Sequence, residues 1–274
     1  MSEKIKVLVV MRETSGSRFT HYHPVAETTP IVCSLLLEAG FEVELCNNLE
    51  LVKNLDETPQ PVVLGCGGQT HLKDVPNAVQ GLLHYDVVLF HSKLEVKDDA
   101  AVAALRSFVE EHGRGLVVTH EASPSFAHFD DTTPDWINLI GSAFVYSEHG
   151  NGSSIPKPPS ELTVYATDPS HPIMNGVDEE FALKEEFFQL MRPARNGDIG
   201  HEIAAAEDPR ESQREPVAIV LERGDGRVFH LYLGHFLNTH FDTNYQKMLI
   251  QGVEWVAGDT TRNDTVVARV SSWF

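Results

Sequence analysis

Short apolar runs alternate along this chain with segments whose apolar residues recur at helical spacing. The runs Lys4–Met11, Asp86–His91 and Leu116–Thr119 consist mainly of apolar and β-branched residues. A short, nearly continuous run of this kind predicts a strand that is buried on both faces, as in a parallel sheet. The third run follows Gly115 and leads directly into His120, so the pattern places this histidine at the end of a central strand.

Helices are predicted between and after these strands. Thr28, Thr29 and Pro30 favour a helix start, with threonine as the N-cap and proline in the first turn, and Gly40 favours its end. The other predicted elements up to the C-terminus are a strand at Phe41–Cys46, a helix capped by Asp98 and ended by Gly113, a short helix at Pro134–Ile140 and a last helix at Asn244–Ala257. The strand–helix–strand order predicts a doubly wound α/β fold.

An antiparallel hairpin is predicted late in the chain. Val217–Glu222 and Arg227–Leu233 flank an Asp225-Gly226 turn, and this arrangement is typical of a β-hairpin. Glu161–Thr167 alternates and predicts a further strand, whereas the Gly, Ser and Pro residues of 147–160 predict a loop. We therefore expect a mostly parallel sheet with a late antiparallel hairpin.

Length, composition and charge narrow the class of protein. A chain of 274 residues has the length of one large α/β domain, and we expect a single domain over residues 1–274. The net charge of −19 disfavours binding to nucleic acid or to an anionic membrane surface. There is no apolar run long enough to span a membrane, no signal-peptide core and only three cysteines, so a cytoplasmic location is expected.

The placement of the fourteen histidines suggests chemistry. His21, His23, His91 and His235, like His120 with its neighbour Glu121, follow the ends of predicted strands. The carboxyl ends of parallel strands meet at one edge of a sheet, where ligands bind. Imidazoles gathered there can bind a divalent metal or act as general acids and bases. The blander alternatives are an exposed, inert His21/His23 pair and a core histidine at position 91 or 120.

Several common catalytic motifs are absent from the sequence. There is no H-E-x-x-H, no C-x-x-C, no G-x-S-x-G and no G-x-G-x-x-G after the first strand. The sequence therefore gives no specific signal for a zinc protease, a redox dithiol, a serine nucleophile elbow or a dinucleotide site.

A series of short motifs, in order along the chain, resembles the ThuA-like (trehalose utilisation) family of the class I glutamine amidotransferase-like superfamily. The matching segments are the strand ending in His120 after Gly113-Arg114-Gly115, Ile140–Phe144 with His149, His171-Pro172-Ile173, Glu185–Phe188, Gly226–Phe229, Leu233-Gly234-His235 and Gly252–Gly258. Lys184 and Glu185 stand near a position where the family has aspartate, and Phe188 replaces a common tyrosine.

The resemblance implies a flavodoxin-like three-layer α/β sandwich and a role in carbohydrate metabolism. It also implies that His120, His149, Glu186 and His235 line one pocket, joined by His21 or His23. Glutamine amidotransferases carry their nucleophilic cysteine at the turn that His120 and Glu121 occupy here, so glutaminase activity is not implied.

The leading hypothesis is therefore an enzyme that acts on a sugar or keto-sugar derivative, with a divalent metal, zinc first, as its expected cofactor. The candidate residues are His120, Glu121, Glu186 and His235 for catalysis, His21, His91, His149 and His240 for substrate binding, and His23, His120 and His235 for metal binding. Glu186 is a candidate general base or ligand, and a homo-oligomer, most simply a homodimer, is the expected assembly.

Two other functions compete with this one. A non-catalytic carbohydrate-binding or regulatory module on the same fold would depend on Trp136, Tyr146, Phe187 and Phe188, which are otherwise core residues. A third hypothesis is an oligomeric protein whose histidines sequester metal.

Overall fold

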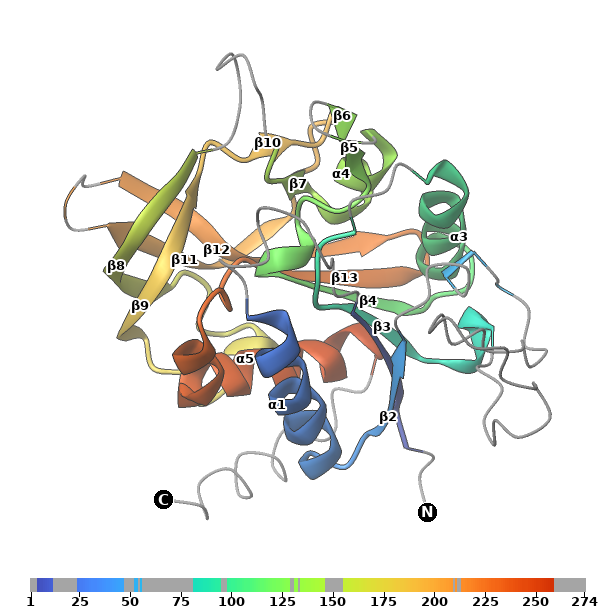
Figure 1. The fold of residues 1–274 in the computed structure, drawn as a ribbon, viewed down its shortest axis with the longest axis horizontal. Coiled ribbons are helices and arrows are strands. Elements are labelled where there is room, and N and C mark those ends of the chain that lie inside the picture. The colour runs from blue at the N-terminus through green and yellow to red at the C-terminus, as the bar shows by residue number, and fades with distance from the viewer. Residues whose placement is uncertain are drawn as a thin grey trace, which may run out of the picture.

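A computed structural model of the chain describes residues 4–11, 24–46, 52–53, 55, 81–94, 98–128, 131–132, 134–145, 155–208, 210 and 213–258. Nine strands of this part form one sheet, in the order β2-β1-β3-β4-β13-β12-β11-β8-β9 (Figure 1). Their bounds are β1 Lys6–Val10, β2 Glu42–Cys46, β3 Val87–Phe90, β4 Gly115–Thr119, β8 Ile155–Ala166, β9 Glu180–Gln189, β11 His201–Asp208, β12 Gln213–Arg223 and β13 Gly226–Leu231. Two small two-stranded sheets pair β5 Ala127–His128 with β6 Asp131–Thr132 and β7 Ser142–Ala143 with β10 Arg192–Pro193.

The first half of the large sheet is parallel. Strands β2, β1, β3, β4 and β13 pair in parallel, and every pair has a continuous register. Numbered along the chain within this half, their order is 2-1-3-4-5, which is the flavodoxin-like order of doubly wound sheets. The predicted α/β fold class is confirmed.

Helices cover both faces of the sheet and make three layers. Helices α1 Val25–Glu38 and α5 Thr243–Val256 lie on one face, and α3 Asp99–Glu110 and α4 Pro134–Ile140 on the other (Figure 1). Short 3₁₀ helices span η2 Leu82–His84, η3 His120–Ala122, η4 Pro172–Met174 and η5 Leu237–Phe241. None of the helices in the described part of the chain has the length and apolar character needed to cross a membrane.

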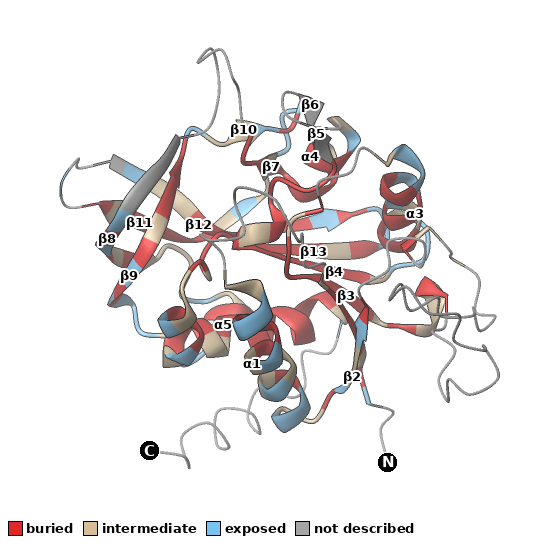
Figure 2. Ribbon diagram, viewed as in Figure 1, coloured by how far each residue is buried: buried red, intermediate tan, exposed pale blue. Residues whose placement is uncertain are grey.

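The alternation of side chains along each central strand builds two cores. In β1, Val7 and Val9 belong to the core under α1 and α5, whereas Leu8 and Val10 belong to the core under α3 and α4. In Figure 2, β3 and β4 at the centre of the sheet carry the colour of buried residues, in agreement with packing on both faces. It explains why the strands are continuous apolar runs in the sequence.

Helix α5 packs unusually close to the sheet because glycine occupies the contact. A Cβ atom on Gly252 would lie 2.2 Å from Cδ1 of Phe229 in β13, and one on Gly115 would lie 2.7 Å from Cγ2 of Val256. Both positions therefore bring the helix onto β4 and β13, the two strands that lead toward His120 and His235.

The second half of the sheet is antiparallel and larger than predicted. The hairpin of β12 and β13 is confirmed, but its turn is formed by Gly224 and Asp225 and not by Asp225-Gly226, because Gly226 already pairs with Arg223 as the first residue of β13. Strands β11, β8 and β9 continue the sheet beyond the hairpin. Adjacent strands twist by about 20–25°, so the five steps from β4 to β9 accumulate roughly 100° or more. In Figure 1, β8 and β9 accordingly run steeply across the view, while β4 and β13 lie nearly horizontal.

Two predicted boundaries are wrong. Helix α1 starts at Val25 and not after a Thr28 cap, because the Pro24 carbonyl already accepts N–H groups of the first turn and the Thr29 hydroxyl donates to the Val25 carbonyl at 2.7 Å.

Strand β8 begins at Ile155, within the predicted loop, although Pro156, Pro158 and Pro159 follow. The register of β8 with β9 shifts between Lys157 and Ser160. On its other side, β8 pairs with β11 only from Thr163 onward, so the prolines need no N–H group for hydrogen bonds to β11.

Candidate active site

Three side chains from distant parts of the chain meet at the carboxyl edge of the parallel strands. His120 follows β4 directly, His235 lies four residues beyond β13, and Glu186 comes from β9 at the far edge of the sheet. The Glu186 Oε2 atom lies 3.0 Å from Nε2 of His120 and 3.2 Å from Nδ1 of His235. The twist of the antiparallel half is what carries Glu186 across to the two histidines.

His120 is held in one orientation. Its side chain is buried, and its Nδ1 lies 2.6 Å from the backbone carbonyl oxygen of Tyr232. A carbonyl can only accept a hydrogen bond, so Nδ1 carries a proton and Nε2 is the atom presented to Glu186. The ring of Phe188 stacks on the imidazole, with a centroid distance of 4.1 Å and an angle of 21°. The histidine is therefore fixed on both nitrogens and on one face.

The electrostatics of the pair favour charge on both partners. Burial works against the charged form of His120, but the hydrogen bond and charge of Glu186, with Glu185 behind it, raise its pKa above the ordinary value. Burial likewise opposes ionisation of Glu186, but the interactions with His120 and His235 outweigh it and lower the pKa of Glu186. Each partner therefore favours the charged form of the other.

The three side chains also form a set of donors suited to a metal ion. One ligand atom from each of His120, Glu186 and His235 lies within 4.8 Å of the others, and the His235 ring meets His120 edge-on at 5.2 Å. Two imidazole nitrogens and one carboxylate oxygen match the His₂Glu ligands of catalytic zinc sites, which leave a fourth position open. The residues present therefore fit a divalent metal.

His91 and His240 lie next to this centre but are buried, with both ring nitrogens of each occupied. His91 contacts the hydroxyls of Thr28 (2.9 Å) and Thr119 (3.1 Å). His240 donates to the Phe236 carbonyl at 2.9 Å, while its Nε2 lies 3.3 Å from the Tyr245 hydroxyl. Their exposed fractions are 3% and 0%, which places them behind the site, so substrate contact by these two histidines stays a prediction.

The remaining predicted residues are not brought into this group by the described part of the chain. Glu121 lies in η3 beside His120 but is not among the three metal-binding candidates. His21, His23 and His149 lie outside the described residues.

The aromatic residues of the binding-module hypothesis are poorly placed for stacking on a sugar. Trp136 and Phe187 have exposed fractions of 0% and 1%, and the Trp136 indole N–H donates to the Ser123 carbonyl. Phe188 is also buried and packs on His120, and Tyr146 lies outside the described residues.

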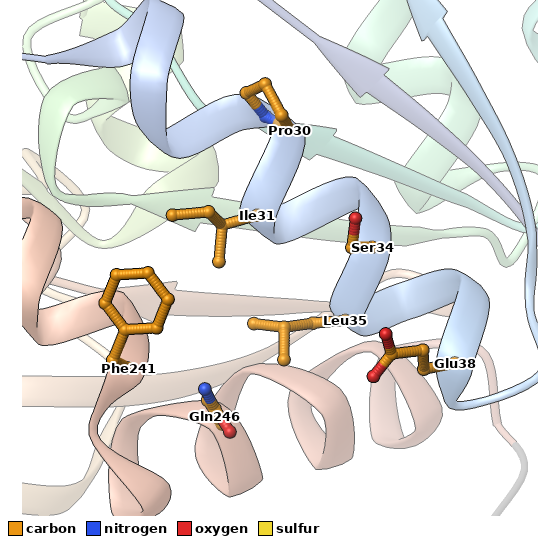
Figure 3. A pocket seen from close by; sticks show the side chains of 7 residues that line it. All are labelled: Pro30, Ile31, Ser34, Leu35, Glu38, Phe241 and Gln246. Carbon is orange, nitrogen blue, oxygen red and sulfur yellow. The ribbon is translucent and has the colours of Figure 1, made fainter.

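Two apolar grooves of about 310 Å³ each lie beside helix α1. Figure 3 shows the first groove, between α1 and the segment that carries Phe241 and Gln246. Its lining offers one carboxylate, Glu38, and no histidine, so this groove lacks the group of donors that meets at Glu186.

Two contributions to the centre were missed by the sequence analysis. The Tyr232 carbonyl that orients His120 belongs to the backbone and leaves no signal in the residue type. Glu185, which the sequence analysis treated only as a family match, is fully buried beneath the centre. An apolar alternation at Phe181, Leu183 and Phe187 puts position 185 on the inner face, and that was the available signal.

The fold and this histidine–glutamate centre define a flavodoxin-like α/β protein whose chemistry sits at the carboxyl edge of its sheet. The family profile described as "ThuA: Trehalose utilisation" matches residues 69–256, well over half of the chain. The chain belongs to the ThuA family, and this membership connects it with carbohydrate utilisation. No curated protein sequence matches the chain.

Solved structures support the same fold. A ThuA-like protein from Parabacteroides merdae is 19% identical with a TM-score of 0.68, and the match covers 94% of this chain and 92% of the other. A ThuA-like protein from Bacteroides uniformis is 15% identical, covers 92% and 91%, and has a TM-score of 0.62. A cytoplasmic protein from Salmonella typhimurium is 11% identical, covers 92% and 98%, and has a TM-score of 0.55. At these identities the comparisons define the fold alone.

Proposed function

We propose that this ThuA-family protein is an enzyme that acts on a sugar or keto-sugar derivative, with His120, Glu186 and His235 as its reactive centre. The observation that carries the proposal is the single Glu186 oxygen shared by two imidazole nitrogens at 3.0 and 3.2 Å. Charged and hydrogen-bonding groups gathered in this way, with a shifted pKa on more than one of them, are characteristic of functional sites.

The residues have distinct roles in this proposal. In the metal-free centre, His120 Nε2 and Glu186 Oε2 hold a proton between them, so the pair can deliver it to, or remove it from, a sugar hydroxyl or the carbon next to a carbonyl. The Tyr232 carbonyl keeps the His120 proton on Nδ1 and its second nitrogen on the reactive side. Phe188 covers one face of the imidazole and excludes water from it.

A divalent metal, zinc first, is part of the proposal. His120 Nε2, His235 Nδ1 and a Glu186 oxygen would hold it in place of the shared proton, in agreement with the donor set of catalytic zinc sites. Such an ion, when bound, polarises a carbonyl group or activates a water molecule. Each part of the centre therefore suits the carbonyl and hydroxyl groups of a keto sugar.

The test is turnover of disaccharides and of their keto derivatives, followed by NMR of the sugar signals. We expect Glu186→Gln to lower turnover of an accepted substrate by about 100-fold or more, as for loss of a general acid–base group. His201→Gln is the matched control, because His201 pairs with Asp168 at the surface and should keep wild-type turnover. Turnover that survives the loss of Glu186 would refute the proposal, and binding without turnover by the wild type would favour the binding module.

A further inference from the structure

Beside Glu186 on β9, Glu185 points the opposite way and is fully buried. Its carboxylate accepts hydrogen bonds from the backbone N–H groups of Gly234 (2.9 Å), His235 (3.2 Å) and Glu186 (2.9 Å) and from the Thr239 hydroxyl (2.7 Å). A buried carboxylate is very costly unless such donors satisfy it. These bonds therefore tie β9 firmly to the segment that follows β13.

Two of the four donors belong to the reactive centre itself. The N–H groups that Glu185 binds at His235 and Glu186 belong to two of the three residues whose side chains form the centre. Gly234 has a φ of +116°, and a Cβ there would lie 2.8 Å from the Tyr245 hydroxyl oxygen, so glycine alone lets this backbone turn toward Glu185. The local backbone is shaped around the buried carboxylate.

We propose that Glu185 is a positioning residue that sets the distance between His235 and Glu186, and so the affinity and geometry of the metal and proton site. The inference rests on the proposed function, because it assigns Glu185 a role at the same centre. Glu185 makes no hydrogen bond to any of the three donor atoms, and its hydrogen bonds reach the centre through the backbone of His235 and Glu186, in addition to the effect of its charge on His120. Groups that orient ligands in this way typically change metal affinity by about 10- to 100-fold when removed.

The first experiment measures binding of Co²⁺ alone, a coloured ion with ligand preferences close to those of zinc, to metal-free protein. Glu185→Gln keeps the size of the side chain but replaces one accepting oxygen with an NH₂ group that faces N–H donors. We expect Co²⁺ to bind this variant about 10- to 100-fold more weakly, with a changed visible spectrum.

Asp208→Asn is the matched control. Asp208 is also fully buried, and its partners are Ser160 and Arg210, so none of its hydrogen bonds reaches the reactive centre. We expect this variant to lose stability but to keep wild-type Co²⁺ affinity. Equal affinity losses in the two variants would show a merely structural effect and would overturn the proposal.

A second measurement on metal-free protein separates the proposal from the proposed function. The imidazole ¹⁵N signals of His120 and His235 should move in Glu185→Gln and stay in place in Asp208→Asn. If the wild type binds no Co²⁺, the metal part of the proposed function fails, and these signals alone decide the role of Glu185. Unmoved signals would overturn it. If Glu185→Gln does not fold, Thr239→Val removes the 2.7 Å donor as a milder change, and the same results are expected on a smaller scale.

Discussion

Low pH should lower the free energy of unfolding through protonation of histidines that are buried in the native protein. His91 is well suited to isolate this effect. Burial, with a smaller contribution from the neighbouring His240, lowers the pKa of His91 to about 3. An unfolded histidine has a pKa of about 6.5. Below that pH the unfolded chain binds a proton at this position and the native protein does not. The free energy of unfolding therefore falls as the pH falls from about 6.5 toward 3.

The size of the effect follows from the two pKa values. Between about pH 7.5 and about pH 5, one such histidine lowers the free energy of unfolding by about 2 kcal/mol. Burial also lowers the pKa of His230 to about 3, so this second histidine should contribute a similar amount. His120 has the opposite sign, because its raised pKa favours the native state as protons bind. The pH dependence of the free energy of unfolding is therefore a sum of contributions of opposite sign, and variants of single histidines are needed to separate them.

The assay is urea unfolding of the wild type and of His91→Gln at the two pH values. Wild type should be the more stable at neutral pH, and the difference in free energy should shrink by about 2 kcal/mol at about pH 5. His230→Gln should behave alike, and because His91 bonds toward α1 and His230 toward α4, the two effects should add. A difference that is the same at both pH values would refute the reasoning, since it would mean that native His91 takes up a proton as readily as the unfolded chain.

Two further predictions concern the scaffold. Gly252→Ala should destabilise the protein by about 1–3 kcal/mol, despite the helix-forming advantage of alanine, because the new methyl group would lie 2.2 Å from Cδ1 of Phe229; unchanged urea unfolding would contradict this contact. Asp98→Ala should cost about 1 kcal/mol, because the Asp98 side chain accepts the Ala101 N–H at the start of α3; a variant of wild-type stability would show that the cap contributes nothing.

Much of the scaffold could be predicted because its signals are local. Strand β4 is an apolar run bounded by glycine, the β12–β13 hairpin is marked by adjacent Gly and Asp residues although its turn lies one residue earlier than predicted, and α4 begins and ends where the sequence indicates. The gathering of His120 and His235 also followed from topology, because both come after parallel strands.

The partner of those histidines could not be placed by residue pattern. Glu186 reaches them only because the antiparallel half of the sheet twists back across the strand ends, and this depends on β11, β8 and β9 together. Only the family resemblance suggested it. The burial of Glu185 was hard to predict for a related reason. A glutamate interrupts the apolar alternation of β9, and this weakens the sequence signal for a strand with position 185 on its inner face.

The most direct test of the central claim is the metal content of tag-free protein, measured by elemental analysis for the wild type beside His120→Ala and His201→Ala. The account predicts close to one equivalent of zinc or another divalent metal in the wild type and in the His201 variant. It predicts loss of that metal in the His120 variant, with the fold intact by circular dichroism. A wild type that stays metal-free after supplementation, or a His120 variant that keeps its metal, would contradict the assignment of His120, Glu186 and His235 as a metal centre.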